Sequence, residues 1–432
     1  MNAIDRFDRS LVDALDDLAA PTYPEYFDDA LKRATRGAQR PSWTFVERWI
    51  PMTSTTRRPM LLPSLPMAPL LLLFLLLAVV LATVMIGVGG LFDRSPVPPY
   101  GPAGNGDVVY SSGGDIYARQ LAGGEARLLV GGPGEDVAPL YSPDGTRIAF
   151  FRLTEGSDTL FVTAADGTEA RELLGGRTVA WASWGPDSRS MAVISFAGGD
   201  HTLSVVDAEA GTNRIIDLPV QPEEGVEWRP SDGRELVFRG SDGPLMAIYG
   251  VRPDGTGFRQ ISQFGNGDAF WAPYAMSPDG SQLMYTLGGD TVSIHLLDLD
   301  TEVDRVWGAA MPPPEPGYSA TEHWGSPVFS PDGSQIAFGR YWDEREGTIN
   351  HQIFVASVES DGADAVAIAD IHRSKSGHGP FEYAWAPDGT SVIVRYNDIQ
   401  QMWLADPAGA EAQRLEWGVL NDPPSWQRVE PD

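Results

Sequence analysis

The chain contains no cysteine, so it can have neither a disulfide bond nor a thiolate nucleophile or metal ligand. It also lacks the pentapeptide Gly-x-Ser-x-Gly, which carries the nucleophile of α/β-hydrolases, and it has no EF-hand calcium loop. Basic residues are scarce: 31 Lys and Arg residues are outnumbered by 59 Asp and Glu residues, which gives a net charge of −28. Such a surface repels nucleic acid and anionic lipid headgroups, and we expect no nucleic-acid partner.

Charge is also absent from one long stretch of the chain. Residues 61–92 carry none, and Met67–Phe92 is an uncharged run of 26 residues, 16 of them Leu, Ile, Val or Phe. At about 1.5 Å per residue, a helix of this length exceeds the roughly 30 Å hydrocarbon core of a bilayer. A cleaved signal peptide fits badly because about 60 residues precede the run. The sequence therefore predicts a transmembrane helix within 61–92.

The flanks of this run predict its orientation. Four arginines lie close before it, namely Arg40, Arg48, Arg57 and Arg58. After it, Arg94 is the only basic residue before Arg119. Because positive charge is retained in the cytoplasm, we expect a single-pass protein of the cell membrane with a cytoplasmic N-terminus and everything after residue 92 outside.

Residues 1–60 are predicted to form a short helical cytoplasmic segment. Apolar residues recur every three or four positions at Ile4, Phe7, Leu11, Leu15 and Leu18, which is typical of an amphipathic helix. The segment is either a weakly ordered tail or a docking element, and in the second case residues 1–50 contact a cytoplasmic protein. Residues 93–106 are rich in Pro and Gly and are predicted to be a linker.

A repeated motif organises the rest of the chain, residues 107–428. Its clearest copy is Phe329-Ser330-Pro331-Asp332-Gly333 followed by an alternating apolar strand, which is typical of a strand, a tight turn and a second strand. The motif prolines are Pro143, Pro186, Pro230, Pro278, Pro331 and Pro387, spaced 43 to 56 residues apart. A period near 40 to 50 residues with strand-like content predicts an all-β propeller.

The two ends of this region predict one further blade. Val108–Tyr110, Asp115–Arg119 and Ala126–Leu129 have the pattern of strands without a first strand, and Pro424-Ser425-Trp426 has the pattern of a first strand without a sequel. Together they make a split blade that closes the ring and removes its free sheet edges. We therefore expect seven blades, with six as the alternative.

The repeats over residues 105–428 resemble the TolB-like, WD-repeat-like propeller family with Pro-Asp-Gly turns. That resemblance implies a propeller but no single function, because the family includes binding modules, sensors and domains attached to peptidases. TolB itself has six blades. The N-terminal segment, through Asp5-Arg6-Phe7-Asp8 and Arg40-Pro41-Ser42-Trp43-Thr44-Phe45, is similar to the cytoplasmic leaders of bacterial single-span sensors, including anti-sigma factors.

Long connections on one side of the disc are the predicted partner-binding face. They are Ala309–Glu322, Tyr341–Thr348 and Ile371–Pro380, longer than the usual two to six residues. The candidate ligand-binding residues in or near them are Tyr318, His323, Tyr341, Trp342, His372, His378 and Phe381. Acidic residues before the first strands are expected at the channel mouth on the same side: Glu135, Glu224, Asp268, Glu322 and Glu382.

Three other groups of residues are expected to stabilise the fold or to lie in ordinary turns and loops, without a binding role. The repeated aromatics Tyr141, Trp184, Trp228, Phe329, Trp385 and Trp426 occupy one position per blade and are expected to pack between blades. Asp298, Asp300 and Asp304 could bind calcium, but their position favours a solvated hairpin. His323, His372 and His378 could bind zinc, but ordinary loop histidines are the preferred interpretation. We thus expect no catalytic residue, metal or cofactor.

The sequence as a whole predicts a membrane-anchored propeller outside the cytoplasm that binds or senses a protein, peptide or glycan. It could signal to a cytoplasmic partner such as a sigma factor. The alternatives are an enzyme with a site at the channel mouth, with or without a metal, and a structural scaffold of the cell envelope. Our prediction is that the protein is not an enzyme.

Overall fold

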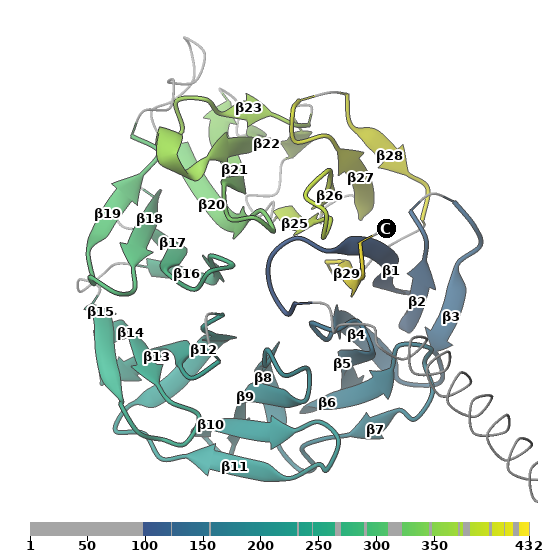
Figure 1. Ribbon diagram of the computed structural model, residues 1–432, viewed down its shortest axis with the longest axis vertical. Helices are drawn as coiled ribbons and strands as arrows, with labels where there is room; N and C mark the ends of the chain where they lie inside the picture. The colour runs from purple at the N-terminus through teal and green to yellow at the C-terminus, as the bar shows by residue number, and fades with distance from the viewer. Residues whose placement is uncertain are drawn as a thin grey trace, which may run out of the picture. The chain divides into compact units, whose positions relative to one another are not determined.

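The computed structural model describes residues 98–431 except 122, 155–156, 231–232, 244, 264–268, 289–291, 310–321, 345–347, 370–371, 375–380, 397–399, 410 and 418–422. The strands of the described residues form seven antiparallel sheets arranged around a central channel (Figure 1). The predicted seven-bladed, all-β propeller is confirmed, and the alternative of six blades is wrong.

Four strands make up most blades, and the first strand of each lies nearest the channel (Figure 1). Blade 1 contains β4 (Glu135–Tyr141), β5 (Arg147–Thr154), β6 (Ser157–Ala164) and β7 (Arg171–Glu172). Blade 2 contains β8 (Thr178–Trp184), β9 (Ser190–Ala197), β10 (Asp200–Asp207) and β11 (Asn213–Ile216). Blade 3 contains β12 (Gln221–Trp228), β13 (Leu236–Asp242), β14 (Leu245–Val251) and β15 (Arg259–Gln263).

The remaining blades follow in chain order. Blade 4 contains β16 (Ala269–Met276), β17 (Gln282–Gly288), β18 (Val292–Asp298) and β19 (Asp304–Trp307). Blade 5 contains β20 (Glu322–Phe329), β21 (Gln335–Glu344), β22 (Thr348–Ser357), β23 (Val366–Ala367) and β24 (His372–Ser374), with the 3-10 turn η3 (Val358–Ser360). Blade 6 contains β25 (Phe381–Trp385), β26 (Val392–Tyr396), β27 (Gln401–Ala405) and β28 (Gln413–Leu415).

Blade 7 combines the two ends of the described chain. The C-terminal β29 (Ser425–Val429) is its innermost strand and pairs with β1 (Gly104–Ser112), which continues into β2 (Asp115–Arg119) and β3 (Arg127–Val130). Val108 lies opposite Trp426 in this pairing. The predicted split blade is confirmed, and strand pairing alone closes the ring.

The Ser-Pro-Asp-Gly turns join the first and second strands of the blades. In blade 1 the Gly145 amide donates to the Ser142 carbonyl at 2.8 Å, which closes the turn. Asp144 Oδ1 accepts from the Ser142 hydroxyl at 2.7 Å and from the Thr146 amide at 3.0 Å. The aspartate thus satisfies polar groups that a tight turn leaves unpaired, which explains why the motif recurs.

The repeated aromatics pack between blades, as predicted. Trp184, Trp228, Trp385 and Trp426 are each 5 to 7% exposed. Each indole also donates to a carbonyl of the preceding blade: Trp184 to Leu140 at 3.1 Å, Trp228 to Ser183 at 3.2 Å, Trp385 to Val328 at 3.2 Å and Trp426 to Ala384 at 3.3 Å. Every acceptor immediately precedes the aromatic of its own blade. The aromatic position therefore links each blade to the one before it.

β-bulges interrupt most of the innermost strands, shortly before the repeated aromatic. The register shifts between Val137 and Leu140 in β4, between Val179 and Trp181 in β8, and at equivalent points in β12, β16 and β20. A bulge bends its strand and re-aims the residues next to it. Ala138 and Pro139, which lie within the β4 bulge, and Trp181 beside the β8 bulge consequently line the central channel.

The predicted cytoplasmic segment and transmembrane span, residues 1–60 and 61–92, lie outside the described residues. Among the described residues, no helix is long and apolar enough to cross a membrane. The segment predicted as a linker, 93–106, overlaps the propeller in part, because β1 begins at Gly104.

Candidate functional site: the mouth of the central channel

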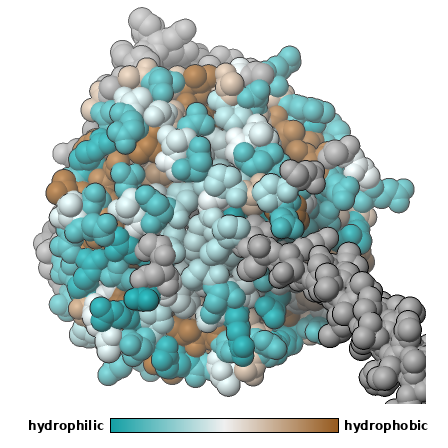
Figure 2. Space-filling model, viewed as in Figure 1, coloured by the Kyte–Doolittle hydropathy of each residue, from teal (hydrophilic) through white to brown (hydrophobic). Residues whose placement is uncertain are grey.

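The central channel opens into a hollow of about 670 Å³ at the turn ends of the innermost strands. We call this hollow the channel mouth. All seven blades contribute to its lining, which consists largely of prolines and aromatic side chains; examples are Pro139, Trp181, Tyr274, Phe329, Trp385 and Trp426. Figure 2 shows, in the same view as Figure 1, that hydrophilic residues cover much of the propeller around paler residues at its centre.

Two charged residues from different blades line this mainly apolar hollow. Glu227 comes from β12 and Arg428 from β29. Burial raises the pKa of the Glu227 carboxyl to about 7, although a hydrogen bond from the Ser183 hydroxyl to Glu227 Oε2, 2.9 Å long, opposes the rise. Glu227 therefore exchanges its proton near neutral pH. Burial lowers the pKa of the Arg428 guanidinium.

The chain segment that precedes β1 lies in the channel mouth. We call residues 98–103 the strap. Arg428 Nη2 donates to the Pro98 carbonyl at 2.9 Å and to the Gly101 carbonyl at 2.7 Å. The Ala103 amide donates to the carbonyl of Pro387 at 2.9 Å, which ties the end of the strap to the turn of blade 6. In Figure 1 the strap is the dark blue trace that curves past the central opening into β1.

Tyr100 is the aromatic residue of the strap and lines the hollow. Burial raises the pKa of its phenol, and the carboxylates of Glu227 and Asp187 raise it further, whereas Arg428 lowers it. The mouth combines an apolar wall with one acidic and one basic group around an aromatic ring.

Glu227, Arg428 and the strap were not predicted from the sequence, yet the repeat contains a signal for the two charged residues. Glu227 precedes the repeated aromatic Trp228, where the other six copies have Leu140, Ser183, Ala275, Val328, Ala384 and Ser425. Arg428 follows Trp426 by two positions, where the other six copies have the motif proline. Each charged residue thus stands at a position of the repeat where the other six copies are uncharged. Both residues can be recognised by comparing the seven copies position by position.

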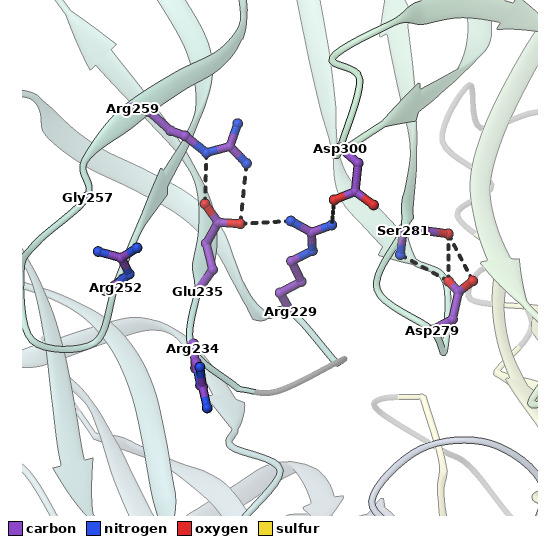
Figure 3. Close-up of a pocket in the computed structure, with 9 residues that line it drawn as sticks. All are labelled: Arg229, Arg234, Glu235, Arg252, Gly257, Arg259, Asp279, Ser281 and Asp300. Atoms are coloured by element: carbon purple, nitrogen blue, oxygen red, sulfur yellow. Dashed lines mark hydrogen bonds and ion pairs between the residues drawn. The ribbon is translucent and has the colours of Figure 1, made fainter.

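A second hollow, of about 550 Å³, lies between blades 3 and 4 (Figure 3). Glu235 joins two arginines there, with Oε2 3.2 Å from Arg229 Nη1 and Oε1 2.9 Å from Arg259 Nε. Arg229 also pairs with Asp300, and Arg259 with Glu302, both from blade 4. Because carboxylates compensate these two guanidinium groups, the network is best explained as a link between the two blades.

Three of the residues predicted for the long-loop face occupy one row of blade 5. His323 in β20 is paired in register with Tyr341 in β21, Tyr341 with His351 in β22, and His351 with His372 in β24. His351 is 1% exposed and was not singled out from the sequence. The backbone therefore brings His323, Tyr341 and His372 together, around a histidine that sequence reasoning missed.

Two of the long connections are partly strands, which corrects the sequence analysis. Tyr341 and Trp342 lie in β21, which runs to Glu344, and β22 begins at Thr348, so the expected loop is an extended hairpin. His323 lies in β20 and Phe381 begins β25. β21 extends past the apolar residues of its first half into the polar and aromatic residues 340–344. Tyr318 and His378 lie outside the described residues.

The predicted ring of acidic residues is described in part. Glu135 begins β4 and is exposed, whereas Glu382 in β25 pairs with Arg395 of β26. Glu224 and Glu322 lie in β12 and β20, and Asp268 lies outside the described residues. Glu135, Glu322 and Glu382 are the first or second residues of their strands, at the strand ends that lie opposite the channel mouth.

The carboxylates considered for calcium have separate partners. Asp298 Oδ1 accepts from the amides of Asp300 at 3.0 Å and Thr301 at 2.7 Å, which is hairpin geometry. Asp300 pairs with Arg229, and Asp304 accepts from the Tyr285 hydroxyl. The hairpin interpretation is confirmed. Across the described part of the chain, no group of three or more His, Asp or Glu side chains has an arrangement that could hold a metal ion.

Comparisons with known proteins show a propeller and leave the family open. No family model matches the chain. An uncharacterized protein of Agrobacterium fabrum, Atu1656, is 26% identical over 204 residues, which cover 46% of this chain and 68% of that protein. A TolB candidate from Agrobacterium tumefaciens has 21% sequence identity and a TM-score of 0.40, over 48% of this chain and 79% of its own.

A structure from a study of two prolyl endopeptidases has 13% identity and a TM-score of 0.51, over 74% of this chain and 50% of the other. Likeness at this level shows the fold alone. It nevertheless contradicts the prediction that the protein is not an enzyme, because that prediction treated a propeller without a nucleophile elbow as evidence against catalysis. Propellers of this shape occur in enzymes, so binding and enzymatic roles are both compatible with the fold.

Proposed function

We propose that the protein is a binding module whose channel mouth holds an extended segment of a partner protein. The observation that carries this proposal is the lining of the hollow: all seven blades supply apolar or aromatic residues to it, and Glu227 and Arg428 add one acidic and one basic group. Pockets of this composition bind through apolar contact and use a few polar groups for orientation. A hollow of about 670 Å³ is large enough for a few residues of a peptide.

We also propose that the protein is anchored in the membrane. The uncharged span within 61–92 holds the propeller outside the cytoplasm, and residues 1–50 contact a cytoplasmic protein such as a sigma factor, so that binding outside can be signalled inside. The support is the uncharged run and the arginines before it. Reporter fusions at residue 50 and after residue 430 should be active in opposite compartments. A cytoplasmic reporter that is active at the C-terminus would contradict this orientation.

Peptides selected on the full-length protein test the binding site. Random peptides displayed on phage should yield ligands for the protein in detergent. Replacing Trp181, which lines the mouth, by Ala should weaken their binding about tenfold, the usual loss when an aromatic anchor is removed. Leu128→Ala, at a side chain that is 53% exposed on β3, should leave binding unchanged.

The long-loop face remains a predicted second surface, and the same assay separates the two. If Trp342→Ala abolishes binding while Trp181→Ala does not, the partner binds the opposite side of the disc. If no peptide is selected, or if all three variants bind alike, the channel mouth is not a peptide site.

A further inference from the structure

The strap has the composition of a peptide that loses little entropy on binding. Residues 98–103 read Pro-Pro-Tyr-Gly-Pro-Ala, and each proline has a fixed φ angle. Gly101 has a φ of +86°, a backbone conformation that side-chain-bearing residues rarely adopt, and so allows the turn after Tyr100. The three prolines pre-organise the rest of the segment, which reduces the conformational cost of placing it at the mouth.

The contacts between strap and mouth divide into two kinds. Arg428 and the Pro387 carbonyl contact the strap backbone, and any extended chain can make these contacts. The Tyr100 side chain forms part of the wall of the apolar hollow, which Glu227 also lines, and is the contribution that depends on side-chain identity. Since these backbone contacts are independent of sequence, a segment from another protein with prolines around one aromatic residue would satisfy the same groups.

We infer that the channel mouth is selective for proline-rich segments that carry one aromatic side chain, and that the strap is a built-in competitor for this site. This inference rests on the proposed function. The strap is continuous with β1, whose pairing with β29 fixes its C-terminal end beside the mouth. Asn105 and Asp388 add to this anchor, because Asn105 Nδ2 donates to Asp388 Oδ2 at 2.8 Å. The competitor is therefore tethered beside the site.

A tethered competitor reduces the affinity for an external ligand in a calculable way. A short tether gives an effective concentration on the order of millimolar. The apparent dissociation constant of the external ligand then equals its intrinsic dissociation constant divided by the fraction of molecules whose mouth is open. If the strap occupies the mouth in nine molecules out of ten, its release should strengthen external binding about tenfold.

A peptide with the sequence of residues 96–103 is the probe for this inference. Its binding to the full-length protein in detergent is followed by fluorescence anisotropy for the wild type and two strap variants. Tyr100→Ala removes the ring from the mouth and should strengthen binding of the peptide about tenfold. Pro102→Ala is the matched control, because Pro102 is exposed and does not line the hollow, and it should bind as the wild type does.

Two further samples complete the test. Pro99→Gly loosens the strap without removing the ring and should strengthen binding by a smaller factor, between those of the other two variants. A peptide in which tyrosine is replaced by alanine should bind every variant more weakly than the parent peptide does. Melting temperatures measured in parallel confirm that the propeller of each variant is folded.

The outcomes separate this inference from the proposed function. If the peptide binds the wild type and Tyr100→Ala equally well, the strap is not a competitor, although the mouth still binds peptides. If the peptide binds neither while selected peptides do bind, the ligand class is wrong. If neither this peptide nor any selected peptide binds, the proposed function falls as well.

Discussion

A chain that ends at residue 424 should not form a stable propeller. This truncation removes β29, the innermost strand of blade 7, and leaves β1 with an unpaired edge at the channel. It also removes Trp426, which is 7% exposed and bonded to the Ala384 carbonyl of blade 6. Loss of a buried Trp alone costs about 3–5 kcal/mol, a large part of the roughly 5–15 kcal/mol that stabilises a typical domain.

Thermal unfolding of the full-length and truncated proteins in detergent, followed by circular dichroism, measures this effect. The control ends at residue 429, so that it retains all of β29. We expect the control to melt as the parent does and the shorter chain to be unfolded or to melt far lower. Similar melting of both truncations would show that β29 does not close the ring.

Replacing Gly145 by Ala should destabilise the propeller more than the same change at Gly389. Both glycines hold the last position of the Pro-Asp-Gly turn, with φ angles of +68° and +74°. A Cβ at Gly145 would lie 2.5 Å from the Arg428 carbonyl oxygen of blade 7, whereas at Gly389 the nearest atom is Pro331 Cδ at 3.9 Å. The two sites therefore share the backbone strain and differ in the clash.

Backbone strain and steric clash together determine the expected loss of stability in each variant. A left-handed conformation costs an alanine about 1–2 kcal/mol at either site. The clash with a backbone atom should add about 1–3 kcal/mol at Gly145, because β29 must move. Denaturant unfolding curves of the two variants give the difference directly. Equal losses of stability would mean that the turn of blade 1 does not pack against β29 as described.

The fold could be predicted because it depends on features that recur. One turn motif and one aromatic position suffice to define each blade, and both have a local physical cause: Asp144 closes its own turn, and Trp228 fills the gap to blade 2. The split blade was predictable from the incomplete repeats at the two ends. Trp426 identified β29 even though no turn motif follows it.

The channel mouth was missed because it is built from departures from the repeat. Glu227 and Arg428 stand at repeat positions that are uncharged in the other six copies. Residues that recur from copy to copy do not include them. The strap was missed for another reason: a segment rich in Pro and Gly is usually a linker, and its contacts with Arg428 depend on a strand more than 300 residues away in the chain. Tertiary contacts of this kind leave no local pattern.

For the long-loop face, the predicted secondary structure was wrong. Length alone assigned Tyr341 and Trp342 to a loop, although the hairpin of β21 and β22 continues through them. The row that joins His323, Tyr341, His351 and His372 follows from strand register, and register was not available from the sequence.

Photo-crosslinking from position 100 tests most directly the claim that the chain occupies its own channel mouth. Benzoylphenylalanine in place of Tyr100 keeps an aromatic side chain at that position of the full-length protein. Irradiation followed by mass spectrometry should give intramolecular crosslinks to peptides that contain Glu227 or Arg428, which both line the hollow with Tyr100. Crosslinks only to outer strands such as β3 or β7, or none within the chain, would contradict the account.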